Sequence, residues 1–326
     1  MEMDGSSVFQ YWMAVFLLPM RVLKSIEEVC NKFLWGVGVN GRKRAPVSWS
    51  RVAMPKMEGG LGIRDFKTWN KACVLRHLWN LLAKAGSLWV AWIQKYRIKG
   101  NDLWGIAANS VSSWVWKKVL KCREVAHAHV NGTGSSLTWD GKKLVKYSVK
   151  TVWNSIRIPS SSVDWFSVLW GKPFIMKHSL LVWLVVLDRI TTKDHLASWG
   201  LTDVNSCVLC PGGLESRDHL FSLCSFSKAV FQVVLKKICR WPDFTDWSSH
   251  LRWVVQRWSG TTSPAKIGRL LWVMCCAYIW RERCTRVYGV KRISDPSQLS
   301  VAVMQEFEIY ASSTIELQKM ASVVMS

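Results

Sequence analysis

The chain has 326 residues, of which 49% are hydrophobic, and its 44 Lys and Arg against 22 Asp and Glu give a net charge of +22. This length predicts about two domains. The longest apolar runs, Ser179 to Leu187 and Leu270 to Trp280, are shorter than the roughly 20 residues that span a bilayer, which excludes a membrane partner. The first residues lack the basic stretch of a signal peptide, and the ten cysteines are expected to be reduced thiols. We therefore expect an intracellular protein.

Helical periodicity dominates the N-terminal part. In the first predicted helix, apolar residues recur at spacings of three and four, with Pro19 in the first turn and Gly36 at the end. These apolar residues are Val22, Leu23, Ile26, Val29, Cys30, Phe33 and Leu34. A second helix is predicted to be capped by Thr68 and to run to about Lys84.

The segment from Leu137 to Lys150 has a different pattern. It centres on Asp140-Gly141, a dipeptide typical of a hairpin turn. Further helices are predicted from Pro173 to Leu187, after a capping box of Thr191 and Asp194, from Ser263 to about Gly289, and from Ser294 onward. The expected fold class is mainly α, with helical bundle-like segments, a small β-hairpin and a compact zinc-binding module of CCHC type.

That module is predicted from four residues near the middle of the chain. Cys207, Cys210, His219 and Cys224 follow the spacing C-x2-C-x8-H-x4-C. Three thiolates and one imidazole suit a closed, tetrahedral zinc site without an open position for water. We expect one structural Zn²⁺ per chain, with a short helix ending at Cys224 offering the last two ligands. The alternative is three ordinary buried cysteines beside an incidental histidine.

The sequence around these ligands contains further landmarks. They are Trp183-Leu184, Arg189 to Leu196, Trp199-Gly200-Leu201, Glu215-Ser216 and Asp218 to Phe221. Together they resemble the zinc-binding domain at the C-terminal end of reverse transcriptases from plant LINE-type (non-LTR) retrotransposons. The resemblance covers residues 147 to 240 and implies that the metal ligands of that family fall on the four residues named above.

The resemblance extends in both directions along the chain. It is carried by segments such as Phe33 to Gly36, Val47-Ser48-Trp49, Gly59 to Ile63, Trp69 to Ala72 and Ile279 to Arg283. It implies four parts: residues 1–105 resemble the region after the polymerase palm, 106–146 form a variable linker with the start of a β-hairpin, 147–240 form the zinc-binding domain, and 241–326 form a C-terminal helical segment. The stretch 124–146 has few family landmarks, which indicates a deletion.

Catalysis is not expected. A polymerase palm needs paired aspartates for two metal ions, and the chain contains no Asp-Asp. The resemblance implies that palm, fingers and endonuclease would lie before residue 1 and that a ribonuclease H domain would follow the chain. A nuclease after the zinc motif would need carboxylates, but Trp247 to Arg281 contains no Asp or Glu. The glycines at 36, 38 and 41 lie in a predicted loop, so we expect no nucleotide cofactor and no small-molecule substrate.

The uneven charge favours nucleic acid as a partner. Residues 1–164 carry 25 Lys and Arg against 10 Asp and Glu, and a basic half of this kind fits binding to a phosphate backbone. The candidate contacts are Arg42, Lys43, Arg44, Arg51 and Lys56. Of the 22 tryptophans, those near loops or turns are candidates for stacking on unpaired bases in RNA or single-stranded DNA. They are Trp35, Trp49, Trp104 and Trp139.

Three interpretations of function stay open. The first is a non-catalytic, retroelement-derived zinc-binding protein with weak, sequence-tolerant nucleic-acid binding. The second is a decayed retrotransposon fragment without a selected function, and the third is a protein–protein adaptor that uses the zinc module. The resemblance favours the nucleus over the cytoplasm.

Overall fold

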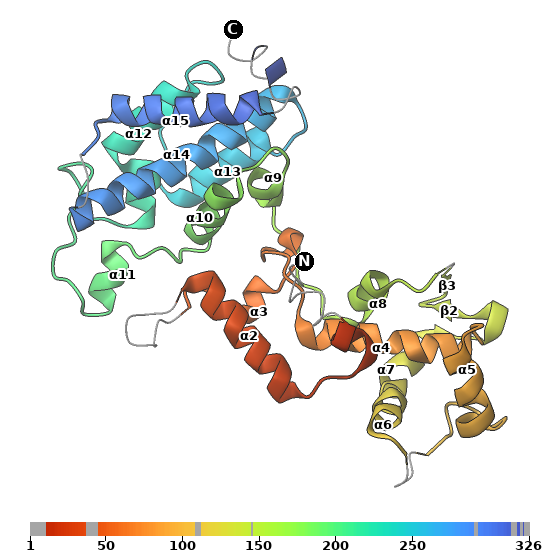
Figure 1. The fold of residues 1–326 in the computed structure, drawn as a ribbon. Coiled ribbons are helices and arrows are strands. Elements are labelled where there is room, and N and C mark those ends of the chain that lie inside the picture. The colour runs from red at the N-terminus through yellow and green to blue at the C-terminus, as the bar shows by residue number, and fades with distance from the viewer. Residues whose placement is uncertain are drawn as a thin grey trace. The chain divides into compact units, whose positions relative to one another are not determined.

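The structure is a computed structural model, and helices make up most of it (Figure 1). The residues it describes are 11–36, 45–107, 112–144, 146–289, 293–313, 318–319 and 322. The chain divides into two compact units. The first comprises Met1–Pro55 and Gly60–Ser161, and the second comprises Lys56–Gly59 and Ser162–Ser326. The predicted mainly helical class is confirmed.

The first unit contains short helices and three very short strands. The helices are α2 (Met20–Trp35), α3 (Trp49–Val52), α4 (Phe66–Leu82), α5 (Leu88–Ile93), η2 (Gln94–Ile98), α6 (Trp114–Lys121), α7 (Arg123–His127), η3 (Gly134–Ser136) and α8 (Val149–Ile156). The strands are β1 (Val130–Asn131), β2 (Thr138–Trp139) and β3 (Lys142–Lys143).

Helix α4 is the centre of the first unit. The predicted cap at Thr68 is wrong: Asp65 caps the helix, since its carboxylate accepts hydrogen bonds from the backbone N–H groups of Lys67 and Thr68 at 3.3 and 2.8 Å. Its side chains at Leu75 and Leu78 are buried, and α6 and α8 pack against it. The core of this unit therefore forms around one capped helix.

The predicted hairpin is present as β2 and β3. Asp140 and Gly141 connect these strands with φ values of 50° and 72°, as a two-residue turn with two left-handed residues requires. The additional strand β1 pairs with β2, so the sheet is antiparallel and three-stranded in the order β1-β2-β3. Trp139 lies in its middle strand and is only 2% exposed, so its ring packs in the core and is not accessible to a base.

Helix α2 forms as predicted, but most of its apolar residues do not enter a core. Leu23 is buried, whereas Val29 is 65% exposed and Phe33 is 91% exposed. The reason is geometric: α4 is the main neighbour of α2 among the described elements, and a single neighbour covers only one side of a helix.

The second unit is a group of helices around α14. Its elements are η1 (Lys56–Glu58), α9 (Phe166–Trp170), α10 (Met176–Val186), α11 (Lys193–Ser198), η4 (His219–Leu223), α12 (Ser225–Leu235), α13 (Trp247–Trp258), α14 (Ser263–Tyr288) and α15 (Pro296–Ser312). The limits of α14 match the prediction, with Pro264 in the first turn and Gly289 at φ 64° after the last residue.

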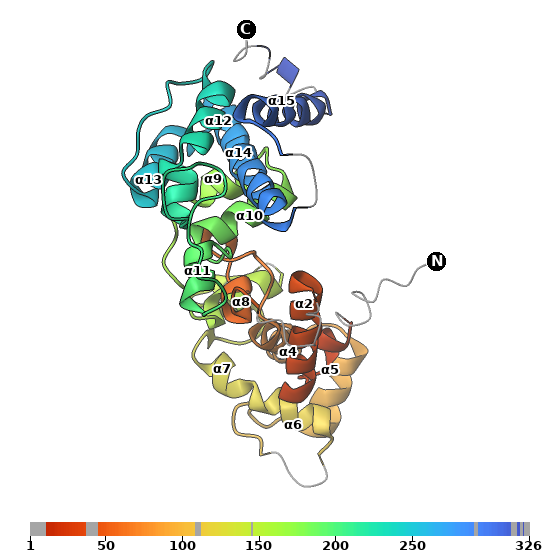
Figure 2. The same cartoon turned by 90° about the vertical axis from the view of Figure 1, so that its left-hand side faces the viewer.

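Burial identifies α14 as the core of the second unit. Every residue from Leu270 to Ile279 is buried, because α10, α12, α13 and α15 all pack against this helix (Figure 2). Within the described ranges, no helix combines the length and the apolar character that a membrane span requires.

Candidate metal centre

Cys207 and Cys210 lie in a tight loop that its own backbone closes. The N–H of Cys207 donates to the carbonyl of Gly213 at 2.9 Å, and the N–H of Leu209 donates to the Cys207 sulfur at 3.4 Å. The first bond closes the turn, and the second places a donor against a sulfur that carries negative charge when it is deprotonated. The loop therefore presents both sulfurs to one point.

His219 and Cys224 come from the π-helical turn η4. The N–H of Cys224 donates to the carbonyl of His219, five residues earlier, at 2.7 Å. The N–H of His219 in turn donates to the hydroxyl of Ser216 at 3.1 Å. The predicted short helix before Cys224 is present in this wider form, which brings residues five apart onto one side.

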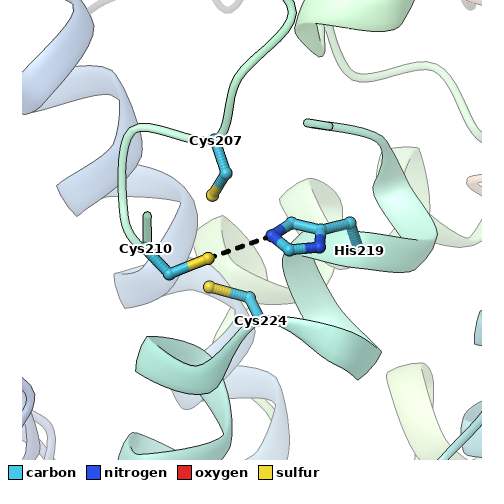
Figure 3. Close-up of side chains that lie close together, drawn as sticks. All are labelled: Cys207, Cys210, His219 and Cys224. Carbon is cyan, nitrogen blue, oxygen red and sulfur yellow. Dashed lines mark hydrogen bonds between the residues drawn. The ribbon is translucent and has the colours of Figure 1, made fainter. Parts of the chain in front are cut away.

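The four side chains converge on one buried point (Figure 3). Their ligand atoms lie within 4.8 Å of one another, and the Cys210 sulfur is 3.3 Å from Nε2 of His219. A tetrahedral zinc ion with bonds of about 2.3 Å to sulfur holds its sulfurs about 3.8 Å apart. The donor set and its spacing fit such an ion. Metal binding by these four residues stays a prediction.

Hydrogen bonding within the cluster sets its protonation. The bond with Cys224 holds the pKa of the Cys207 thiol well below its usual range despite burial. The same bond, together with burial, raises the pKa of Cys224, and the contact with Cys207 raises the pKa of His219. A metal ion needs thiolates and a neutral imidazole, so its binding would displace the shared protons.

Gly213 makes room for the histidine ligand. It has φ 151°, and a Cβ at this position would lie 2.4 Å from Cε1 of His219. Gly212, directly before it, has open space where a Cβ would be. Only one of the two adjacent glycines is therefore required by the site.

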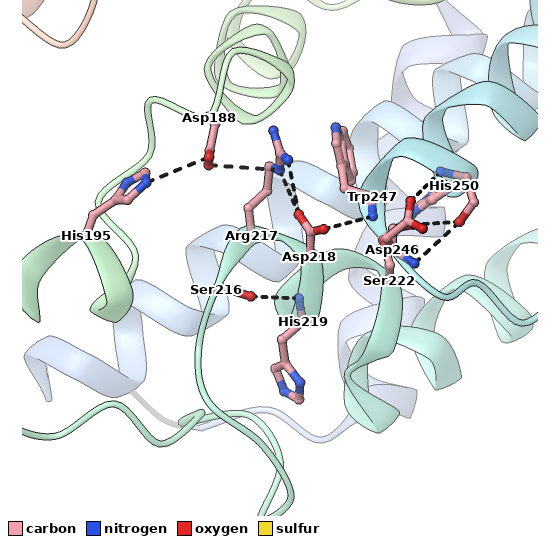
Figure 4. Close-up of polar contacts among 11 residues, drawn as sticks. Asp188, His195, Ser216, Arg217, Asp218, His219, Ser222, Asp246, Trp247 and His250 are labelled. Carbon is pink, nitrogen blue, oxygen red and sulfur yellow. Dashed lines mark hydrogen bonds and ion pairs between the residues drawn. The ribbon is translucent and has the colours of Figure 1, made fainter. Parts of the chain in front are cut away.

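A polar network holds the backbone just before His219 (Figure 4). Asp218 accepts a hydrogen bond from the N–H of Trp247, the first residue of α13, at 3.4 Å, and another from Arg217 at 3.1 Å. The Arg217 guanidinium also lies 3.9 Å from the carboxylate of Asp188. The segment that carries the ligand is thus connected to α13 and to the end of α10.

Two arginines of α14 contact residues 207–215, a segment that we call the zinc loop after the ion that it is proposed to hold. Arg283 donates two hydrogen bonds to the Glu215 carboxylate, at 2.6 and 3.0 Å. Arg286 donates to the carbonyls of Val208 and Leu209 at 3.1 and 3.4 Å. The sequence interpretation missed both contacts. The sequence held one hint of the first contact, because Glu215 and Arg283 each lie in a segment that carries the family resemblance, although the two segments are far apart in the chain.

Glu215 also determines how α11 begins. The predicted capping box of Thr191 and Asp194 is wrong, since the residue before α11 is Thr192 and its side chain makes no capping bond. Instead, the Glu215 carboxylate accepts a hydrogen bond from the N–H of Lys193 at 2.9 Å. A distant carboxylate takes the role of the local cap because the zinc loop folds back onto this helix terminus.

The predicted nucleic-acid contacts are separated in the chain. Three of them lie outside the described residues, namely Arg42, Lys43 and Arg44. Arg51 is half-buried in α3 of the first unit. Lys56 belongs to the second unit, where its amino group lies 4.4 Å from the centre of the Trp170 ring, and burial lowers its pKa. Contact of any of the five with nucleic acid stays a prediction.

Residues 147–231 match the sequence model of a family described as zinc-binding in reverse transcriptase. This segment is similar to the zinc-binding domain of reverse transcriptases. It covers about a quarter of the chain and contains all four residues of the cluster. The match begins near α8 and ends within α12.

Two curated relatives come from Arabidopsis thaliana. One, named "Putative ribonuclease H protein", is 22% identical over a gapped alignment of 370 positions, which covers 87% of this chain and 59% of the relative. The other, named "Uncharacterized mitochondrial protein", is 22% identical over 116 residues, which cover 35% of this chain and 75% of the relative. The chain thus spans about three-fifths of the length of the first relative. No solved structure matches this chain significantly.

Proposed function

We propose that this chain is the C-terminal part of a plant LINE-type reverse transcriptase, holds one structural zinc ion and binds RNA or single-stranded DNA without catalysing a reaction. The observation that carries the proposal is the buried cluster of three cysteines and one histidine inside a segment similar to reverse-transcriptase zinc-binding domains. The Arabidopsis origin of both relatives supports the plant assignment.

The proposed ion has a structural role. Four protein ligands complete a tetrahedron, so no position is left for a reacting water. Cys207, Cys210, His219 and Cys224 would hold the ion, and it would supply folding free energy to a loop with few apolar side chains. Arg283 and Arg286 would keep that loop against α14 whether or not nucleic acid is bound.

Binding to nucleic acid is proposed from charge and from the relatives. A net charge of +22 attracts polyanions, and each phosphate neutralised on a single strand adds about 0.7 to the log–log salt slope. One relative has a name that refers to ribonuclease H, an activity directed at nucleic acid. We also propose a nuclear location, and its support is the resemblance to plant LINE-type reverse transcriptases alone.

We also propose that the chain is not catalytic. Metal-dependent polymerases and nucleases need several carboxylates around their ions. The sequence has no Asp-Asp pair and no carboxylate from Trp247 to Arg281. Primer extension and plasmid nicking with Mg²⁺ or Mn²⁺ should equal buffer controls. Activity that is lost when one acidic residue of this chain is replaced would overturn this part.

One observation supports the adaptor alternative. A hollow of about 270 Å³ lies between α12 and α15, and its lining includes Val233, Val301 and Met304. Apolar hollows of this kind suit protein partners as well as small molecules.

The deciding experiment combines metal analysis with binding. Purified protein is titrated onto single- and double-stranded RNA and DNA at several salt concentrations. The proposal predicts one zinc per chain and tighter binding to single strands, with affinity falling as salt rises. Zinc without nucleic-acid binding would favour the adaptor. Protein with neither zinc nor nucleic-acid binding would favour the decayed fragment.

A further inference from the structure

A basic hollow with an aromatic wall lies on the first unit. It has a volume of about 420 Å³. Its lining residues are Trp104, Lys117, Leu120, Lys121, Arg123, Glu124 and His127. We call it the α6–α7 hollow, since all of these residues except Trp104 belong to those two helices.

The aromatic wall is held in place by backbone contacts. The Arg123 guanidinium donates to the carbonyls of Leu103 and Trp104 at 2.6 and 2.8 Å, and to that of Leu120 at 3.0 Å. These bonds fix the Trp104 loop against the junction of α6 and α7. The Trp104 ring is half-buried and meets the exposed His127 ring edge-on, with 5.3 Å between ring centres. The two rings therefore form a preformed corner.

The remaining lining carries positive charge. Lys117 and Lys121 are four residues apart on α6 and so share one face of the helix. Arg123 follows at the start of α7, and Glu124 is the single acidic residue in the lining. Lys118 does not line the hollow, because its amino group lies toward the Trp114 ring, 5.5 Å from its centre.

We infer that the α6–α7 hollow binds one unpaired nucleotide of a single-stranded nucleic acid. The base would stack at the corner of Trp104 and His127, and the flanking phosphate would meet Lys121 and Arg123. Every base has a π-face, so such a site tolerates any sequence. The inference rests on the proposed function and deepens it by naming the contact site.

Two other tryptophans near a turn or a hollow have covered rings. Trp139 is buried and stacks on His129 with 5.1 Å between ring centres. Trp241 lines a larger hollow beside Lys236 and Arg240, but its face stacks on Phe231 with 4.5 Å between ring centres.

An acidic peptide is the alternative ligand of the α6–α7 hollow. Such a peptide would pair with the lysines without needing Trp104, so a requirement for Trp104 distinguishes a nucleotide from an acidic peptide.

The test compares two pairs of variants of the full, zinc-loaded chain. Trp104→Leu and Lys121→Ala change the hollow, whereas Trp114→Leu and Lys118→Ala make the same chemical changes on α6 outside it. Trp114 is 46% exposed, which makes it a suitable control. Binding of labelled 12-mers, U12 and dT12, is measured by fluorescence anisotropy between about 50 and 200 mM salt.

The expected results differ between the two variants. Trp104→Leu should weaken binding by about five- to 100-fold with an unchanged salt slope, as loss of one stacked base predicts. Lys121→Ala should reduce the salt slope by about 0.7, as loss of one phosphate contact on a single strand predicts. Both controls should bind like the wild type. Lys121 is exposed, so its variant remains informative if Trp104→Leu fails to fold.

Two failures can be told apart. If the wild type binds strands normally and the hollow variants match their controls, the site is wrong while the proposed function stands. If the wild type binds neither strand, the proposed function and the site are both overturned. A response to Lys121→Ala without any response to Trp104→Leu would indicate a phosphate or acidic-peptide site and would contradict base stacking.

Discussion

Glu215 and Arg283 form a buried ion pair that joins the zinc loop to the long helix α14. Nη2 of Arg283 lies 2.6 Å from Oε1 of Glu215, and the two side chains are 1% and 0% exposed. The same oxygen accepts the N–H of Lys193 at the start of α11. One carboxylate thus connects three segments that are far apart in the sequence.

Replacing Arg283 should destabilise the second unit. Arg283→Met leaves the Glu215 carboxylate buried without its counter-ion, which should lower the free energy of unfolding by about 3–5 kcal/mol. The measurement is urea unfolding of the zinc-loaded protein. Arg281→Met is the matched control, because Arg281 is exposed on the same helix and should change the free energy by less than about 1 kcal/mol.

A second substitution separates the two causes of this loss. Adding Glu215→Gln to Arg283→Met removes the unpaired charge and keeps an acceptor for the Lys193 N–H, so part of the stability should return. A double variant that is less stable than Arg283→Met alone would contradict a charge-based explanation.

Local features of the fold and of the candidate metal centre were predictable from the sequence, whereas contacts between residues far apart in the chain were not. The Cys207–Cys210 loop and the Asp140-Gly141 hairpin depend on residues within a few positions of each other, so spacing alone indicates them. The bond between Glu215 and Arg283 joins residues 68 positions apart, and only the packing of α14 brings them together. The start of α11 was mispredicted for the same reason.

The burial of helix α2 is a second property that the sequence did not predict. Its periodicity predicts the helix, but periodicity cannot tell how many neighbours a helix has. Phe33 therefore belongs to the predicted apolar stripe and is nevertheless 91% exposed. Conversely, Trp139 lies beside a turn in the sequence yet is buried, since its ring packs against the rings of Trp79 and His129.

Gly213→Ala should disturb the candidate metal centre. The added methyl group would lie within 2.4 Å of the His219 ring, so the ring must move away from the three sulfurs. We expect a loss of zinc affinity of about 10- to 100-fold, as for other changes that misplace a ligand. Competition with a chromogenic chelator measures this loss. Gly212→Ala meets open space and should bind zinc like the wild type. Equal affinities for all three proteins would contradict the claim that Gly213 makes room for a histidine ligand.

Stability should fall below pH 6.5 because of His250. Burial lowers the pKa of this fully buried side chain to about 3, and the Trp272 indole N–H donates to its Nε2 at 2.9 Å. Its folded pKa lies below the unfolded value, so its contribution is complete above about pH 6.5 and is lost as pH falls toward 3.

A variant isolates this effect from proton uptake by the zinc ligands. Between pH 6 and 4 the wild type should lose up to about 1.4 kcal/mol per pH unit more than His250→Gln, since one group contributes at most that slope. Unfolding in urea at each pH gives both slopes. Parallel slopes would mean that His250 is not held in its neutral form.

The basic run at Arg42, Lys43 and Arg44 should contribute to nucleic-acid affinity without sequence preference. Changing all three to Ala should flatten the log–log salt slope by about two to three units if each touches a phosphate. Affinity for all strands should fall alike. A variant whose slope equals that of the wild type would remove these residues from the interface.

The central claim is that Cys207, Cys210, His219 and Cys224 bind one zinc ion that stabilises their loop. The most direct measurement is the zinc content of the purified protein and of Cys210→Ser, together with limited proteolysis. Cys239→Ser, which changes a buried cysteine outside the cluster, is the control. We predict one zinc per chain for the wild type and the control, none for Cys210→Ser, and new cleavage near residues 200–225 in that variant. Wild-type protein without zinc, or Cys210→Ser with full zinc content and an unchanged cleavage pattern, would contradict the claim.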